Sequence, residues 1–511
     1  MFNKKILCIG NETSSTDLLV SNLANLNNTI NYGLISDQNF IPINNGFYHT
    51  TILDLVISDL ITVSKRFDQV MLLDQPVKEW PHPKSLLTTF KICKELELLG
   101  IDIIYKNNEN IKNHIHFDNF IRENKSFCIY PWINFIERDG GNSLCARSPN
   151  LLTAEPNVHS WNSNNERQHI KSMMLEGKLI PEKCQVCYDH ENMGIESYRQ
   201  YETKEWLAIL DIATLDDLTN ITSPYYYELT LNNTCNIKCR GCSPAYSSSV
   251  EKEFKEHNIK FYGISDRKLD KKLSSYSNID KINIDLLTSK HRVYLAGGEP
   301  TAISEVYTFM QQCIDKNVVD FEFTLGTNGV KFSNKFLELS KSFTRFHFSI
   351  SLDGFGKIND YWRWGSNWET IIENIYKVKK LGHNISINCV PGLYNITNLH
   401  LLYEFLDKEF PDVSIYLQVN YLPWQNAFNH PNVELVLESL LRCKRTKVYQ
   451  NDGKSNKTAI DELYDYYSNS PSFNLEHLSD FFKYNDQLDR ARNSSLKDYI
   501  PELEECRKYL I

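Results

Sequence analysis

The sequence lacks a long block of basic residues and a long apolar run. Its 511 residues carry 55 basic and 64 acidic side chains, a formal net charge of −9, and its densest basic stretch, Arg442 to Lys447, is short. Nucleic acid is therefore not an expected partner. No apolar stretch approaches the roughly 20 residues of a membrane span, and the apolar run after Met1 is too short for a signal peptide. We expect no membrane association.

Cysteine, in contrast, is plentiful. Without an export signal, the 13 cysteines favour a reducing, cytoplasmic compartment, where clustered thiols bind metal more often than they form disulfides. A hydrophobic content of 41% and a charged content of 23% are ordinary for folded proteins. The length predicts several domains.

The first part of the chain alternates short apolar segments with amphipathic ones. The strand candidates are KKILCIG, NTINYGLIS, DQVMLLD and IDIIY. This alternation predicts a doubly wound, Rossmann-like α/β domain over residues 1–115. Its first turn, Gly10-Asn11-Glu12, lacks G-x-G-x-x-G, so dinucleotide binding is not supported and a docking or scaffold role is the simpler expectation.

Periodicity weakens over residues 125–205, where four cysteines stand out. Cys128 precedes IYPW, Cys145 follows DGGNSL, and Cys184 and Cys187 form a C-x-x-C pair. Four thiolates from three short loops are able to surround one metal centre. From these residues alone, zinc, an iron-sulfur cluster and simple burial all remain open.

Residues 220–420 return to α/β alternation with a longer repeat. Six candidate strands, separated by helical patterns, are 225–231, 292–296, 320–326, 345–351, 385–390 and 413–419. Six βα units fit a curved parallel sheet or an open barrel. In such folds the functional groups belong on the loops after the strand carboxyl ends.

Four motifs follow the first four of these strands. They are the cysteines Cys235, Cys239 and Cys242, then Gly297-Gly298-Glu299-Pro300, then Thr327-Asn328-Gly329, then Ser351-Leu352-Asp353-Gly354. We expect all four at one rim of the sheet. A structural zinc site has four protein ligands, so the three cysteines leave one coordination position without a protein donor.

The four motifs, in this order and spacing, resemble the radical SAM superfamily. The resemblance implies that Cys235, Cys239 and Cys242 bind a [4Fe-4S] cluster whose open iron chelates S-adenosyl-L-methionine. It implies an enzyme that reductively cleaves this cofactor to a 5′-deoxyadenosyl radical, which abstracts hydrogen from a peptide, natural-product or sugar substrate. An electron donor such as flavodoxin or ferredoxin is an implied partner. The family often has an aromatic residue before the third cysteine, where this chain has Gly241.

The same resemblance implies roles for six further residues. Gly297, Gly298 and Glu299 would meet the methionyl amino group, because glycines permit close backbone approach and a carboxylate accepts hydrogen bonds from an ammonium. Ser351 would contact the ribose or the carboxylate, and Arg363 would clamp the carboxylate. Asn328 would shape the rim of the site.

Upstream, the cysteine-rich segment is similar to a twitch or SPASM-like auxiliary cluster domain. On this reading Cys128, Cys145, Cys184 and Cys187 fully ligate a second [4Fe-4S] cluster, which either relays an electron or staples the domain. The expected fold is thus a partial (β/α)6 radical SAM barrel over residues 220–420, preceded by the 125–205 and 1–115 domains.

The remaining residues, 421–511, read as amphipathic helices that cap the barrel or form a partner surface. Two alternatives stay open. One is a non-catalytic scaffold protein that binds iron-sulfur clusters or zinc, and the other is a bifunctional protein whose first domain carries its own reaction. Release of 5′-deoxyadenosine separates the enzyme from the scaffold.

Overall fold

The computed structural model describes most of the chain after residue 116 and five strands before it. The described residues are 6–9, 32–36, 49–51, 69–72, 102–105, 117, 119–138, 141–148, 152, 158, 161–192, 196–260, 279–417, 425–451, 454–469 and 471–510. The chain divides into two compact units. One comprises Met1–Phe127 and Thr203–Asn220, and the other comprises Cys128–Glu202 and Ile221–Ile511.

The first unit contains a five-stranded parallel sheet. Its order is β3-β2-β1-β4-β5, with strands β1 (Ile6–Ile9), β2 (Tyr32–Ser36), β3 (His49–Thr51), β4 (Gln69–Leu72) and β5 (Asp102–Tyr105). The chain starts at the central strand β1, adds β2 and β3 on one side, and then adds β4 and β5 on the other side, as in a doubly wound sheet. Four of these strands are predicted by the sequence, and β3 is not. The predicted helices and the Gly10-Asn11-Glu12 turn lie outside the described residues.

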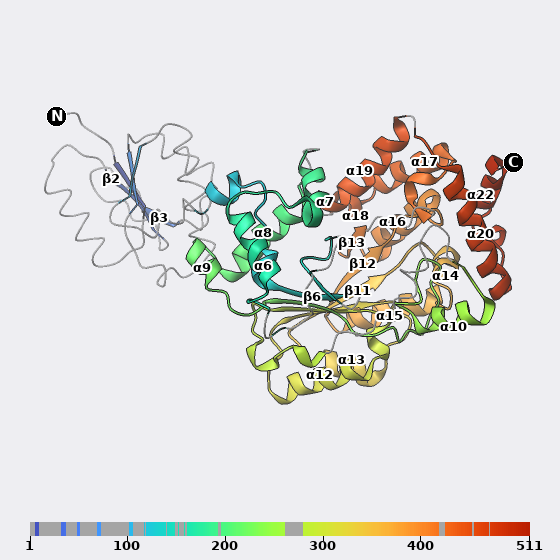
Figure 1. Cartoon of the computed structure of the whole chain (residues 1–511), viewed down its shortest axis with the longest axis horizontal. Coiled ribbons are helices and arrows are strands. Elements are labelled where there is room, and N and C mark those ends of the chain that lie inside the picture. Colours follow the sequence, from blue (N-terminus) through green and yellow to red (C-terminus); the bar gives the residue numbers. More distant parts are fainter. Residues whose placement is uncertain are drawn as a thin grey trace. The chain divides into compact units, whose positions relative to one another are not determined.

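The second unit is built on an eight-stranded sheet with the order β13-β12-β11-β10-β9-β8-β6-β7 (Figure 1). Six strands in sequence order are parallel: β8 (Tyr226–Thr230), β9 (Arg292–Ala296), β10 (Glu322–Thr327), β11 (Arg345–Ser351), β12 (Asn384–Cys389) and β13 (Ser414–Leu417). All six match the predicted strands to within about two residues. The expected α/β class with a parallel sheet is therefore confirmed.

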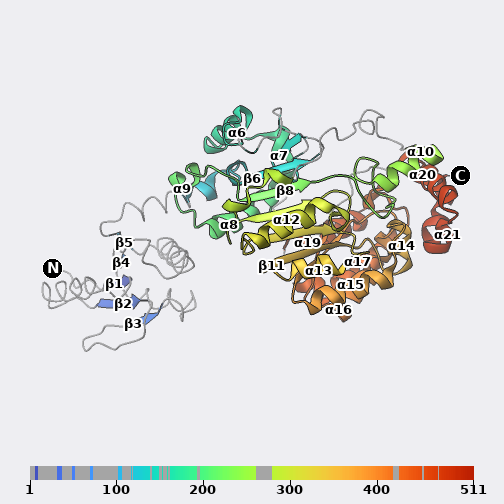
Figure 2. The same ribbon diagram turned by 90° about the horizontal axis from the view of Figure 1, so that it is seen from below.

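Helices follow β9, β10, β11 and β12, and some of them cover one face of the sheet (Figure 1). They are α12 (Ser304–Asp315), α13 (Asn334–Ser340), α14 (Lys357–Trp362), α15 (Trp368–Lys380) and α16 (Leu399–Glu409), of which α12, α13 and α15 lie on the same side (Figures 1 and 2). Phe309 on α12 packs edge-on against Phe323 on β10, with ring centroids 5.7 Å apart. Along each strand buried apolar residues alternate with more exposed ones, so the second face of the sheet is polar, as at Tyr294, Thr324 and His347.

The cysteine-rich segment extends this same sheet. β6 (Asn134–Arg138) pairs in parallel with β8, and β7 (Gly141–Ser143) pairs antiparallel with β6. Helices α5 (Tyr130–Ile133), α6 (Asn165–Leu175), α7 (Pro181–Asn192) and α8 (Tyr198–Leu210) accompany them. The segment expected to form its own domain over residues 125–205 therefore shares one hydrogen-bonded sheet with the barrel strands.

The C-terminal region is helical, as its amphipathic pattern predicts. It comprises α17 (Val433–Lys444), α18 (Lys447–Asn451), α19 (Lys454–Ser468), α20 (Leu475–Arg492), α21 (Leu496–Tyr499) and α22 (Pro501–Glu504). Among all the described residues, no helix is both long enough and apolar enough to cross a bilayer.

Candidate functional site

The predicted motifs gather at the carboxyl ends of β8, β9, β10 and β11. These strands are parallel and adjacent, so the loops that leave them emerge at the same edge of the sheet. The cysteine loop, residues 232–244, follows β8. Its neighbour across the sheet is the turn that begins after Ala296 on β9.

The three cysteines of this loop share one small neighbourhood. Each is partly exposed, and the amide of Cys242 donates to the carbonyl of Cys239 at 3.1 Å, which closes a tight turn. Burial raises the pKa of Cys239 to about 11. Burial also raises the pKa of Cys242, and repulsion from the thiolates of Cys239 and Cys235 raises it further. The loop therefore brings three thiols to the carboxyl end of β8, and raised pKa values favour their protonated form when no cation is bound.

Two adjacent glycines let the β9 turn approach this loop. Gly297 and Gly298 have positive φ angles of 82° and 52°. A Cβ atom on Gly298 would lie 2.3 Å from the carbonyl oxygen of Thr234, immediately before the first cysteine. The amide of Glu299 donates to that same carbonyl at 2.7 Å. The glycine pair therefore brings two backbone segments into contact that side chains would hold apart.

The carboxylate of Glu299 is buried and fully engaged by the protein. Its oxygens accept from the amide and hydroxyl of Thr301 at 3.2 and 2.7 Å, from the hydroxyl of Thr327 at 2.7 Å, and from the amide of Asn328 at 2.7 Å. Burial raises its pKa, while these donors oppose the rise. The carboxylate thus ties the β9 turn to the β10 turn, and its contact with a methionyl ammonium stays a prediction.

Asn328 reaches back to the cysteine loop. Its side-chain amide donates to the side-chain oxygen of Asn236 at 2.7 Å, and its own oxygen accepts from the amide of Val330. This contact links the third motif to the first. Ser351 ends β11 in register with Asn388 on β12 and is partly exposed on the polar face of the sheet.

Arg363 lies beside the cysteines, paired with an acid whose role the sequence did not reveal. Its guanidinium contacts Asp353 at 2.6 Å, and Asp353 also accepts from the amide of Val390 at 2.8 Å. Burial lowers the pKa of Arg363, but the nearby Cys239 and Asp353 outweigh burial and raise it. The Nε atom of Arg363 is buried and has no hydrogen-bond partner among the described residues.

Gly241, the departure from the family pattern, has a structural explanation. A Cβ atom on Gly241 would lie 3.2 Å from both the indole nitrogen of Trp362 and the side-chain oxygen of Gln425. Trp362 is 2% exposed, and its indole also fills the space beside Gly392. A tryptophan from α14 therefore occupies the volume next to the third cysteine. The sequence could not show this, because the two residues are far apart in the chain.

The other four cysteines line one shared cavity. Cys128, Cys145, Cys184 and Cys187 are joined there by Tyr130, Leu144, Arg147, Met174, Val186, Tyr198 and Arg199. Burial raises the pKa of Cys184 to about 12, with repulsion from the other thiols adding to it. Cys184 and Cys187 lie in α7, not in the short loop expected from the sequence. Helical i,i+3 spacing still places both on one face.

This cavity lies at the end of the sheet opposite the cysteine loop. Cys128 precedes β6, and Cys145 follows the antiparallel β7, so both lie near the amino end of β6. Hydroxyls of Tyr130 and Tyr198 are hydrogen bonded at 2.8 Å, and the rings of Tyr130 and Tyr226 are 5.9 Å apart. Tyr198, Tyr130 and Tyr226 therefore form a continuous row of contacts between this cavity and β8.

Both donor sets suit iron-sulfur clusters in chemical type, since thiolates are the ligands of such clusters and of zinc. In the part of the chain that the structure describes, no three His, Cys, Asp or Glu side chains converge closely enough to hold a single metal ion.

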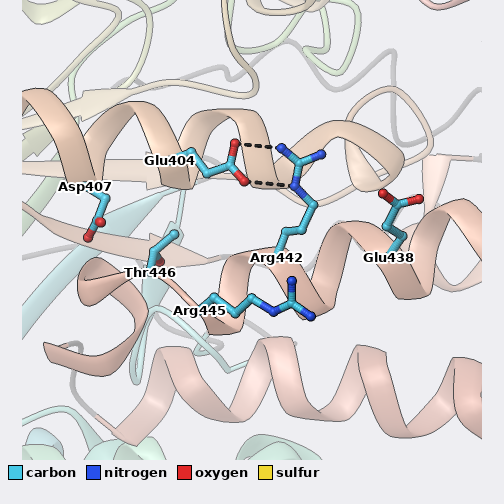
Figure 3. Close-up of a pocket in the computed structure, with 6 residues that line it drawn as sticks. All are labelled: Glu404, Asp407, Glu438, Arg442, Arg445 and Thr446. Carbon is cyan, nitrogen blue, oxygen red and sulfur yellow. Dashed lines mark hydrogen bonds and ion pairs between the residues drawn. The ribbon is translucent and has the colours of Figure 1, made fainter.

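A separate open cleft lies on the outer helices (Figure 3). It has a volume of about 460 Å³ and is lined by Glu404, Asp407, Glu438, Arg442, Arg445 and Thr446. Two hydrogen bonds of 2.9 and 2.8 Å join the guanidinium of Arg442 to the carboxylate of Glu404. Its residues come from α16, α17 and the turn after α17, so the cleft belongs to neither cysteine group.

Comparison with known protein families gives a match over part of the chain. Residues 229–406 match the Radical SAM superfamily, from the end of β8 into α16. This segment, less than half of the chain, is a radical SAM domain. The matched residues include all four motifs of the strand carboxyl ends. The expectation of an enzyme is confirmed at the level of this domain, and its reaction stays unspecified.

The chain resembles solved structures only distantly. The structure titled "Native anSMEcpe with bound AdoMet" shares 17% identity with a TM-score of 0.30, covering 48% of this chain and 62% of its own. Streptococcus suis SuiB bound to precursor peptide SuiA shares 13% with a TM-score of 0.26, covering 63% and 64%. TYW1 with a lysine-pyruvate adduct shares 16% with a TM-score of 0.23, covering 42% and 70%. Comparison with curated proteins gave no match.

Proposed function

We propose that the chain is a radical enzyme in which Cys235, Cys239 and Cys242 hold a [4Fe-4S] cluster with one iron open for S-adenosyl-L-methionine. One observation carries the proposal. Three cysteines without a fourth lie on the loop after β8, in direct backbone contact with the Gly297-Gly298 turn, inside the residues that match the superfamily. When bound, the cluster and its cofactor supply a 5′-deoxyadenosyl radical that abstracts hydrogen from a substrate.

The residues around the loop bind and orient the cofactor. The backbone of the Gly297-Gly298 turn is the expected partner of the methionyl amino group, because the missing Cβ atoms let this turn lie directly against the cysteine loop. Arg363 places positive charge beside the thiolates, and its Nε atom is a donor for the methionyl carboxylate. Ser351 supplies a hydroxyl on the polar face, and Asn328 holds the rim through Asn236.

The substrate in this proposal is a peptide, natural product or sugar. The polar face of the sheet supports a substrate rich in hydrogen-bonding groups, since it carries the Arg292–Glu322 ion pair at 3.1 Å and the imidazole of His347. Tyr294 reaches across this face, where a Cβ atom on Gly326 would lie 2.7 Å from its hydroxyl. We further propose a cytoplasmic location and a small electron-transfer protein, flavodoxin or ferredoxin, as the reductant.

Cys128, Cys145, Cys184 and Cys187 hold a second [4Fe-4S] cluster in this proposal. Four thiols around one cavity support it, as do the flanking cationic side chains of Arg147 and Arg199. A cluster with four protein ligands has no open iron for S-adenosylmethionine. Its role is either to accept an electron from the substrate or to staple the segment to the sheet.

Anaerobic reconstitution followed by iron counting and a 5′-deoxyadenosine assay tests the proposal. We expect about eight irons per intact chain, since each four-iron centre contributes four. The Cys239→Ala variant should lose about half of the iron and all 5′-deoxyadenosine formation. Cys313→Ala is the matched control, because Cys313 is a single buried cysteine on α12. Normal 5′-deoxyadenosine formation by Cys239→Ala would contradict the proposal.

A second variant isolates the auxiliary site. Cys184→Ala should also lose about four irons, yet the remaining cluster should still change its electron paramagnetic resonance spectrum when S-adenosylmethionine is added. An unchanged iron content in Cys184→Ala would show that this group of cysteines holds no cluster.

A further inference from the structure

The cysteine loop carries a buried arginine that points away from the cysteines. Arg240 stands between Cys239 and Cys242 and is 0% exposed. Its guanidinium donates to the carbonyl of Tyr361 at 2.9 Å and to the side chains of Asn485 and Asp489 at 3.0 and 2.6 Å. The last two residues belong to α20, so the C-terminal helix contacts the loop directly.

Asp489 is the centre of this contact. Besides Arg240, its carboxylate accepts from the hydroxyl of Tyr361 at 2.9 Å, the hydroxyl of Ser494 at 2.8 Å and the amide of Leu496 at 2.9 Å. The Arg240 guanidinium also lies 3.6 Å from the centroid of the Tyr361 ring. A buried charge pair with this many donors is held in one geometry.

Residues of α20 also hold the main chain of the loop. The Tyr484 hydroxyl donates to the carbonyl of Arg240 at 2.9 Å. Arg492 donates to the carbonyl of Lys238 at 2.8 Å and forms a fully buried ion pair with Glu253 on α10 (Ser248–His257). Helices α10 and α20 lie side by side (Figures 1 and 2).

The opposite side of the loop is fixed by α14 and the residues after it. The amides of Lys238 and Arg240 donate to the carbonyls of Trp364 and Trp362, each at 2.7 Å. The apolar side of α20 completes this packing, since one core cluster contains Leu478, Phe481, Tyr484 and Leu488 of α20 together with Tyr361, Trp362, Leu393 and Tyr394. The loop is therefore clamped between two elements that pack on each other.

We propose that α20 is the positioning element of the cysteine loop, and that the Arg240–Asp489 pair fixes the geometry in which the loop holds its cluster and binds S-adenosylmethionine. The inference rests on the proposed function. It assigns a role to a helix that the radical SAM match does not reach, since that match ends at residue 406. Arg240 and Asp489 are positioning residues, because they act through the loop.

The test compares the intact chain with Asp489→Asn, a variant of nearly the same shape that lacks the charge facing Arg240. Reconstituted, reduced protein is titrated with S-adenosylmethionine while its electron paramagnetic resonance spectrum is recorded. We expect the cofactor to bind roughly tenfold more weakly, since small displacements of positioned groups cost one to two orders of magnitude. The iron held by the auxiliary cysteines should be unchanged.

Asp486→Asn is the matched control on the same helix. Asp486 pairs with Arg507 at 2.5 Å, but the two side chains are 46% and 34% exposed and make no hydrogen bond with the described residues of the cysteine loop, and we expect wild-type titration. Tyr484→Phe is the second variant, because it keeps the ring in the core and removes the hydroxyl that contacts Arg240. We expect this variant to bind S-adenosylmethionine about threefold more weakly, a smaller loss than that from the buried charge.

The outcomes separate this inference from the proposed function. A wild-type chain whose spectrum does not respond to S-adenosylmethionine would refute the proposed function itself. A responsive wild type with Asp489→Asn and Tyr484→Phe both titrating like Asp486→Asn would overturn only the role of α20. If Asp489→Asn fails to fold, Tyr484→Phe alone decides.

Discussion

Gly298 stands where the β9 turn meets the cysteine loop, and its missing side chain determines how close the two segments come. Its φ angle of 52° is unfavourable for other residues, and a Cβ atom would lie 2.3 Å from the Thr234 carbonyl. The backbone angle and the steric contact each oppose a larger residue at position 298. A second glycine in the same chain allows their two contributions to the loss of stability to be measured separately.

The substitution Gly298→Ala is therefore expected to destabilise the fold by about 2–4 kcal/mol, the sum of left-handed backbone strain and overpacking. It should also reduce the iron retained after reconstitution. Thermal denaturation and iron counting provide the two measurements.

Gly382→Ala is the comparison for this variant. Gly382, which lies just after α15, also has a positive φ angle, 81°, but nothing lies within 4 Å of the position of its Cβ atom. Its expected cost is about 1–2 kcal/mol, from the backbone term alone. Equal losses in the two variants would show that contact with Thr234 does not matter.

At the scale of residues, the sequence predicted some contacts of the site and not others. Spacing alone placed the three cysteines beside the Gly297-Gly298 turn, because loops after adjacent parallel strands share an edge. Spacing could not show that the carboxylate of Glu299 accepts from Thr327, or that Arg240 faces α20. Each of those contacts joins segments whose separation only the fold determines.

At the scale of helices and strands, a buried ion pair joins α10 to α20. The Arg492–Glu253 ion pair joins the two helices at 2.6 Å, with the side chains only 1% and 2% exposed. Removing one partner of a buried pair leaves the other charge without compensation, whereas exposed pairs contribute little.

The Glu253→Gln variant should accordingly lose about 3–5 kcal/mol of stability. Glu256 on the same helix pairs with Lys252 at 3.7 Å, with side chains 52% and 76% exposed, and Glu256→Gln should change stability by less than about 0.5 kcal/mol. Chemical denaturation of both variants measures the difference. Similar losses in the two would argue against a structural role for the buried pair.

At the level of elements, the sequence predicted strands well where a repeat was present. The six barrel strands were found because apolar residues alternate between turn signals and helical patterns separate them. β6 and β7 were missed because they lie in a segment without periodicity: β6 is buried on both faces, and β7 has only three residues. The C-x-x-C pair was expected in a loop, although the PEKC sequence starts a helix with proline at its first position.

Across the whole molecule, buried histidines make stability depend on pH. His430 is 0% exposed, and burial lowers its pKa from 6.5 to about 3, while the backbone amide of Asn432 donates to its Nδ1 atom. Burial likewise lowers the pKa of His291 to about 4. Both are neutral in the folded chain but take up a proton near pH 6.5 when unfolded.

The free energy of unfolding is therefore not reduced by these two histidines well above pH 6.5, and it falls as the pH drops below that value because the unfolded chain binds more protons. Each histidine should reduce the free energy of unfolding by about 1.4 kcal/mol between pH 7.5 and 5.5. In His430→Gln this pH-dependent loss should be smaller by about that amount. The exposed His257 provides the control, and a His257→Gln chain should keep the wild-type pH profile. Identical profiles for both variants would refute the assignment to His430.

The parallel pairing of β6 with β8 has a consequence for electron transfer between the cysteines of the loop and those of the cavity. Because one ladder of backbone hydrogen bonds joins β6 to β8, the segments that carry the two groups belong to a single sheet. Moving one segment relative to the other would have to break hydrogen bonds between these two strands. Any exchange of electrons between the two groups would therefore take place within one sheet rather than across an interface between separate domains.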